Sequence, residues 1–77
     1  MKIETLPTQL VPQLDMTRLM TRLSKGPMLV PDDDLVLSNR STLYKQGLAC
    51  GGKIKVLKKS ILTKGGTTEV YEISFHE

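Results

Sequence analysis

Four apolar side chains recur with helical spacing in the first third of the chain. They stand at positions i, i+3, i+4 and i+7, which together form one helix face: Met16, Leu19, Met20 and Leu23. Pro12 suits the entry of such a helix because its missing N–H costs nothing there, and Gly26-Pro27 suits its end. The pattern predicts a helix over residues 13–25, preceded by an extended arm over residues 1–12.

A second helix is expected after the acidic run at residues 32–34. Ser38 is suited to cap its start, because a serine hydroxyl can accept a first-turn N–H. Gly51-Gly52 is suited to end it, because glycine tolerates the left-handed conformation. Gly47 lies inside this helix at a cost of about 1 kcal/mol relative to alanine. We therefore expect Gly47 to mark a close approach of two backbones.

Three stretches have the character of β-strands. Their sequences are MLV at 28–30, KIKVLKKSIL at 53–62 and VYEISF at 70–75. In the second stretch the alternation of apolar and polar residues fails near Lys58, which predicts a bulge or bend there. Gly65-Gly66 supplies the positive-φ residues that a hairpin turn needs. The last two stretches are therefore predicted to form a hairpin.

The expected order of elements is helix, short strand, helix, strand, strand. This order predicts the α+β class, with two helices packed on a small antiparallel sheet of about three strands. The chain of 77 residues is expected to form a single domain, because a chain this short buries only about 60% of its unfolded surface. Residues 26–77 would then form a strand, helix and hairpin unit that follows the arm and the first helix.

The composition argues against several classes of protein. Cys50 is the one cysteine, so neither an intrachain disulfide nor a cysteine-rich zinc site is expected, and a cytoplasmic location suits the chain. No apolar run approaches the roughly 20 residues that cross a bilayer, so no membrane partner is expected. Neither a nucleophile motif nor a phosphate-binding glycine loop is present. We therefore expect no enzyme activity, no cofactor, no metal and no small-molecule substrate.

Positive charge gathers in the second half of the chain. The net charge is only +3, but five lysines fall between positions 53 and 64 with no acid among them. Lysines on a strand can contact a phosphate backbone without fixed geometry, whereas the alternative is a charged face that resists aggregation. The first hypothesis is electrostatic binding of DNA or RNA with little sequence preference. The candidate residues are Lys53, Lys55, Lys58, Lys59, Lys64, Arg40, Lys45 and Asn39.

In the segment from Gly26 to Ile73, Arg40-Ser41 opens a helix, a glycine precedes the basic strand Lys-Ile-Lys-Val, and the last strand runs Val-Tyr-Glu-Ile. With these motifs the segment resembles small bacteriophage proteins. Tyr71 stands where tryptophan is frequent in those proteins. The resemblance implies a phage origin, a place in the host cytoplasm, and binding to DNA or to host proteins.

A second hypothesis is an inhibitor or modulator that docks on a host protein complex, such as transcription or defence machinery. It is based on the separation of an acidic pole from the basic one. The candidate residues are Asp32, Asp33, Asp34, Arg18 and Arg22. The acidic run lacks the glycine and distal glutamate of a calcium loop, so a solvated turn is expected there. We expect a monomer, or a weak homodimer through the edge strand at 28–30.

Overall fold

The computed structural model describes residues 3–11 and 13–77. In chain order the elements are α1 (Met16–Leu23), β1 (Met28–Pro31), α2 (Asp34–Ser38), α3 (Arg40–Ala49), β2 (Lys53–Thr63) and β3 (Gly66–His76). The strands form one sheet in the order β1-β3-β2, with both pairs antiparallel. The predicted α+β class and the three-stranded antiparallel sheet are confirmed.

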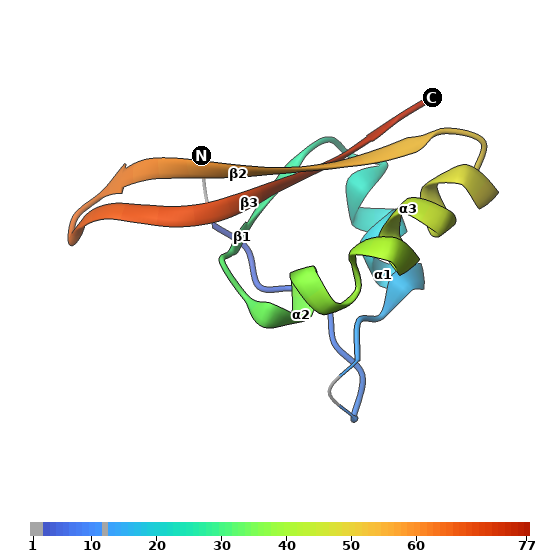
Figure 1. Cartoon of the computed structure of the whole chain (residues 1–77), viewed down its shortest axis with the longest axis horizontal. Coiled ribbons are helices and arrows are strands. Elements are labelled where there is room, and N and C mark those ends of the chain that lie inside the picture. Colours follow the sequence, from blue (N-terminus) through green and yellow to red (C-terminus); the bar gives the residue numbers. More distant parts are fainter. Residues whose placement is uncertain (1–2, 12) are drawn as a thin grey trace.

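The helices lie together on one side of the sheet, and the hairpin of β2 and β3 extends past them (Figure 1). The core is built between the helices and this side of the sheet. Its fully buried side chains include Leu19 of α1, Leu43 of α3 and Ile73 of β3, each 0% exposed. Tyr71 belongs to the same cluster and Phe75 packs against it, as the alternation along β3 predicts. We call this side the helix face and the opposite side the open face.

α1 is shorter than predicted at both ends. Asp15 caps it, since its carboxylate accepts the backbone N–H of Arg18 at 3.1 Å. Residues 7–8 lie beside residues 14–15, because Thr8 bridges Leu14 and the N–H of Asp15 donates to the carbonyl of Pro7 at 3.0 Å. The predicted start at residue 13 is therefore wrong, since Asp15 caps the helix later.

The predicted second helix corresponds to α3, and the structure adds a short helix, α2, before it, so the expected number of two helices is too low. α2 has five residues and begins at Asp34, because the carboxylate of Asp33 accepts the N–H of Leu35 at 2.8 Å. Ser38 is the last residue of α2, so its predicted role as the N-cap is wrong. α3 follows after Asn39. An acidic cap five residues upstream starts the helical segment before the serine is reached.

The glycines of α3 behave as predicted. The N–H of Gly52 donates to the carbonyl of Gly47 at 3.0 Å, and Gly51 has a φ of +84°, which ends the helix in a Schellman motif. A Cβ on Gly47 would lie 2.7 Å from the backbone nitrogen of Ile54. The missing side chain therefore lets α3 approach the start of β2.

The hairpin has no bulge. β2 and β3 pair without interruption from Lys53 opposite His76 to Thr63 opposite Gly66. The predicted bulge near Lys58 is therefore wrong. The last buried residue of β2 is Val56, and beyond it the hairpin extends past the helices (Figure 1). Alternation can fail there without a change in pairing, because the side chains of β2 from Leu57 to Thr63 are exposed or half-buried on both faces.

Candidate functional site

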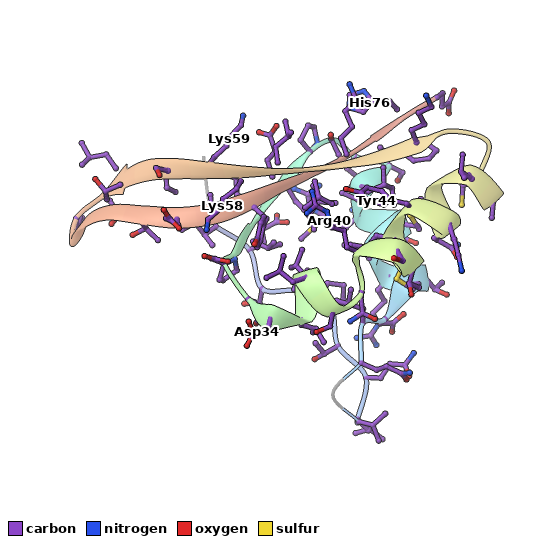
Figure 2. All side chains as sticks on the ribbon, viewed as in Figure 1. Asp34, Arg40, Tyr44, Lys58, Lys59 and His76 are labelled. Carbon is purple, nitrogen blue, oxygen red and sulfur yellow. The ribbon has the colours of Figure 1, made fainter. Side chains whose placement is uncertain are left out.

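The candidate lysines of the hairpin do not share one surface. The pairing register places three of them on the open face: Lys53, Lys55 and Lys59. Lys58 lies opposite Tyr71, which is part of the core, so its side chain is on the helix face (Figure 2). Lys64 stands in the turn between β2 and β3. The basic surface expected from the sequence is therefore divided.

Lys58 is held between two carboxylates. Its Nζ lies 3.0 Å from a carboxylate oxygen of Glu69 and 3.5 Å from one of Asp32. The hydrogen bond with Glu69 raises the pKa of Lys58, and the charge of Asp32 raises it further. Because its charge is offset by two acids, Lys58 is a poor candidate for phosphate contact. Asp32, a candidate partner-binding residue, is used in the same ion pair.

Tyr71 lies beside this cluster on the helix face. Its side chain is 6% exposed. Burial raises the pKa of Tyr71, and the neighbouring Asp32 carboxylate raises it further, while the positive charges of Lys58 and Arg40 oppose the shift. The charges of Arg40 and Lys58 thus act on a buried tyrosine beside an acid rather than belonging to an open cationic surface.

Lys59 is also paired, but on the open face. Its Nζ lies 3.0 Å from a carboxylate oxygen of Glu72 on β3. Among the described residues, the candidate lysines of the hairpin without an ion pair are Lys53, Lys55 and Lys64. Lys53 and Lys55 stand at one end of the hairpin and Lys64 at the other, about 35 Å away along an extended strand.

The remaining nucleic-acid candidates lie on and before α3. The Arg40 guanidinium donates to the Tyr44 hydroxyl at 2.8 Å and lies 5.8 Å from the centre of that ring. The Asn39 amide donates to the carbonyl of Leu35 at 2.9 Å, so it contributes to the junction of α2 and α3. Lys45 is exposed. Lys45 is therefore the one of the three whose side chain makes no hydrogen bond or ion pair with the described residues.

The candidate arginines of α1 have different surroundings. Arg22 Nε lies 2.7 Å from a carboxylate oxygen of Glu4, and its Nη1 donates to the carbonyl of Gly26 at 3.1 Å. Through its contact with Glu4, Arg22 therefore holds the N-terminal arm against the end of α1. Arg18 forms an exposed pair with Asp15 at 3.5 Å.

The structure shows an apolar hollow that the sequence analysis missed. On α3, Leu48 is 65% exposed and Tyr44 is 37% exposed, whereas Leu43 is fully buried. A mostly apolar hollow of about 220 Å³ is lined by Tyr44, Leu48, Lys53 and Ile54. The signal in the sequence is Gly47. Leu43 and Gly47 form the side of α3 that packs against β2, so Tyr44 and Leu48 lie on the neighbouring, exposed side of the helix.

A second hollow adjoins the first. Its volume is about 580 Å³, and it is lined by Leu48, Gly51, Gly52, Lys53, Lys55, His76 and Glu77. Leu48 and Lys53 line both hollows, so the two form one surface that runs from α3 across the start of β2 to the end of β3. We call it the α3–β2 surface, made of Tyr44, Leu48, Lys53, Ile54, Lys55 and His76.

No protein-family model matches the chain, and neither a curated protein nor a solved structure matches it. The resemblance to bacteriophage proteins therefore stays a prediction. Across residues 3–11 and 13–77, no helix has the length and apolar character to cross a membrane. In the same part of the chain, no three metal-ligating side chains gather in one place.

Proposed function

We propose that this protein is a non-enzymatic binding module that docks on another protein through the α3–β2 surface. The observation that carries the proposal is the exposure of Tyr44 and Leu48 beside Lys53 and Lys55. An exposed apolar patch with a charged rim is typical of protein contacts, and tyrosine is enriched in them. The form of this proposal that the sequence resemblance suggests is a phage-encoded modulator of a host protein complex.

The charge distribution supports a protein partner over nucleic acid. Glu69 and Glu72 of β3 pair with Lys58 and Lys59 of β2, so the return strand offsets part of the lysine run. Nucleic-acid binding keeps one supporting observation, which is that Lys53 and Lys55 stand together on the open face. With so few unpaired lysines, only a weak contact with phosphates is expected.

The cluster of Asp32, Lys58, Glu69 and Tyr71 has the geometry of a structural contact, because its ion pairs join the segment after β1 to both strands of the hairpin. The pKa values of Lys58 and Tyr71 are raised, so both groups stay protonated at neutral pH. A general base works best when its pKa lies near the working pH. The cluster instead holds the end of β1, β2 and β3 together.

Capture of partners with two matched leucine variants tests the proposal. Leu48→Asp changes the α3–β2 surface, and Leu62→Asp makes the same change at a leucine of the hairpin that is 85% exposed. Both tagged variants and the wild type are incubated with nuclease-treated extract of the cells that produce the protein. We expect the wild type and Leu62→Asp to retain the same protein, and Leu48→Asp to lose it.

Two outcomes would contradict the proposal. Retention of the same protein by Leu48→Asp would show that the α3–β2 surface is not the docking site. A parallel capture from untreated extract extends the test. If the wild type retains nucleic acid from untreated extract and retains no protein from nuclease-treated extract, the nucleic-acid hypothesis is favoured. Circular dichroism of both variants checks that each substitution leaves the fold intact.

A further inference from the structure

The two edges of the sheet differ in what covers them. At the β1 edge, the arm adds a parallel bridge from Ile3 to Leu29, and the N–H of Glu4 donates to the carbonyl of Leu29 at 2.7 Å. This arm occupies part of the edge that the sequence analysis assigned to a homodimer. At the other edge, β2 pairs with β3 alone among the described residues. β2 therefore presents a row of backbone groups that another strand can use.

The α3–β2 surface lies at the start of this edge. Ile54 of β2 faces the helix side, and together with Tyr44 and Leu48 it lines the hollow of about 220 Å³. Alternate side chains of an added strand point to the two faces of the sheet. The side chains of the added strand that point to the helix face would enter the hollow beside Tyr44 and Leu48. These alternate positions of the added strand therefore need apolar residues.

On the open face, the added strand needs charged side chains rather than apolar ones. Lys53 and Lys55 project there, and neither has an ion pair among residues 3–11 and 13–77. Side chains of an added strand that lie next to them are best matched by carboxylates, because opposite charges on neighbouring strands attract. A segment that alternates acidic and apolar residues therefore fits both faces at once.

The same lysines disfavour a second copy of this chain at the β2 edge. A two-fold antiparallel pairing joins residues of the same face, so centring it on Leu57 would set Lys55 against Lys59 of the other copy. Like charges directly opposite one another are destabilising in a sheet. In that register the edge resists self-pairing, whereas an acidic strand would be attracted to Lys53 and Lys55.

We infer that the partner contributes an extended acidic segment that adds as a fourth strand to β2, with its apolar residues in the Tyr44–Leu48 hollow and its acidic residues beside Lys53 and Lys55. This inference rests on the proposed function and specifies its mode of recognition. Backbone hydrogen bonds supply the affinity in strand addition, and the alternate side chains supply the specificity.

Synthetic peptides test the inference without knowledge of the partner. The probe is a peptide of about eight residues in which glutamate alternates with valine. Three comparisons accompany it: lysine in place of glutamate, N-methylation of alternate backbone nitrogens, and the Lys55→Glu protein variant with Lys64→Glu as its matched control. Binding is followed through the amide resonances of the protein and their hydrogen exchange.

We expect the acidic peptide to shift and protect amides of β2 from Lys53 to Leu57, and to shift Leu48. The lysine peptide and the N-methylated peptide should each bind at least about tenfold more weakly. Lys55→Glu should weaken the acidic peptide by a similar factor, whereas Lys64→Glu should change its affinity less than about twofold. Equal binding of the N-methylated peptide, or shifts without protection of β2, would overturn strand addition.

The outcomes for the two proposals can be told apart. If Leu48→Asp loses its captured protein but the acidic peptide does not bind β2, docking stands and strand addition is wrong. If the peptide protects β2 but Leu48→Asp still retains the captured protein, the edge is a competent strand acceptor and the proposed docking site is wrong.

Discussion

Lys58 of β2 lies directly opposite Tyr71 of β3, on the face of the sheet that carries the core. This pairing separates Lys58 from the lysines on either side of it and brings its ammonium to Asp32 and Glu69. The ion pairs join the segment after β1 to both strands of the hairpin. In the sequence Lys58 belongs to a run of lysines, but in the structure its ion pairs hold the hairpin against the segment that follows β1.

The protein should lose stability at alkaline pH through Tyr71 and Lys58. Both have pKa values above their unfolded values of 10.0 and 10.5, so the folded state holds these protons more tightly. Their stabilising effect is complete below the unfolded pKa values and is lost as pH rises through the folded ones. Urea midpoints measured between about pH 8 and pH 12 should fall, and should fall less steeply in Tyr71→Phe.

Tyr44→Phe is the control for this experiment, because Tyr44 lies on the surface of α3 and outside the core cluster. It should retain the pH dependence of the wild type. A Tyr71→Phe variant that follows the wild-type curve at every pH would refute the role assigned to burial of Tyr71.

Arg22→Ala should lower the free energy of unfolding by about 1–3 kcal/mol, because it removes hydrogen bonds to a carboxylate and to a carbonyl. The Glu4 carboxylate and the Gly26 carbonyl would lose their donors. Arg22→Lys should recover only part of the loss, since lysine lacks the planar fork that reaches both acceptors. Denaturant midpoints at constant m-value measure the effect.

Arg18→Ala serves as the comparison for Arg22→Ala. Its pair with Asp15 is exposed, with 75% of the arginine side chain accessible, so its loss should cost less than about 1 kcal/mol. Equal effects of the two substitutions would show that the contact of Arg22 with the arm adds nothing to stability.

Much of the fold follows from local rules that the sequence displays. The Gly51-Gly52 stop, the hairpin before Gly66 and the alternation of Tyr71 and Ile73 are decided within a few residues, and the structure has all of them. Of the two glycines expected to supply a positive φ to the hairpin turn, Gly66 does so and Gly65 does not. Helix starts were less predictable, because Ser38 and Asp33 are both good caps and the sequence does not say which is used. In the structure Asp33 caps α2, and α3 begins after Asn39 without a side-chain cap.

The candidate site was less predictable than the fold. A run of lysines shows its charge but not its neighbours, and Glu69 and Glu72 become neighbours only through the register of the hairpin. The exposure of Leu48 depends on how α3 is rolled against β2, which Gly47 sets through a contact with Ile54. Both facts belong to tertiary packing, which one sequence does not reveal.

Gly47→Ala should destabilise the protein although alanine is the better helix former. Helix propensity favours alanine by about 1 kcal/mol, but the added Cβ would meet backbone atoms of β2 that cannot yield without moving the strand. The nearest is the nitrogen of Ile54, at 2.7 Å. We expect a net loss of about 1–2 kcal/mol by thermal or urea unfolding.

Gly65→Ala is the matched substitution for Gly47→Ala, because a Cβ at Gly65 has no atom within 4 Å and Gly65 is not among the glycines with positive φ. It should change stability by less than about 1 kcal/mol. If Gly47→Ala proved as stable as the wild type, the close approach of α3 to β2 would not be a constraint on the fold.

Any binding of this protein to DNA should have a salt dependence that reflects the division of the lysines. Each phosphate contact contributes about −0.9 to the slope of log K against log salt, so a full strip of five lysines would give about −4.5. Only Lys53, Lys55 and Lys64 lack an ion pair among the described lysines of the hairpin, which limits the slope to about −3.

Fluorescence anisotropy with a labelled duplex measures this slope. The double variant Lys53→Ala and Lys55→Ala should flatten it, whereas Lys58→Ala with Lys59→Ala should leave it nearly unchanged. A slope steeper than about −4, or equal effects of the two double variants, would mean that the ion pairs with Glu69 and Glu72 give way to phosphates and that the hairpin binds as one basic surface.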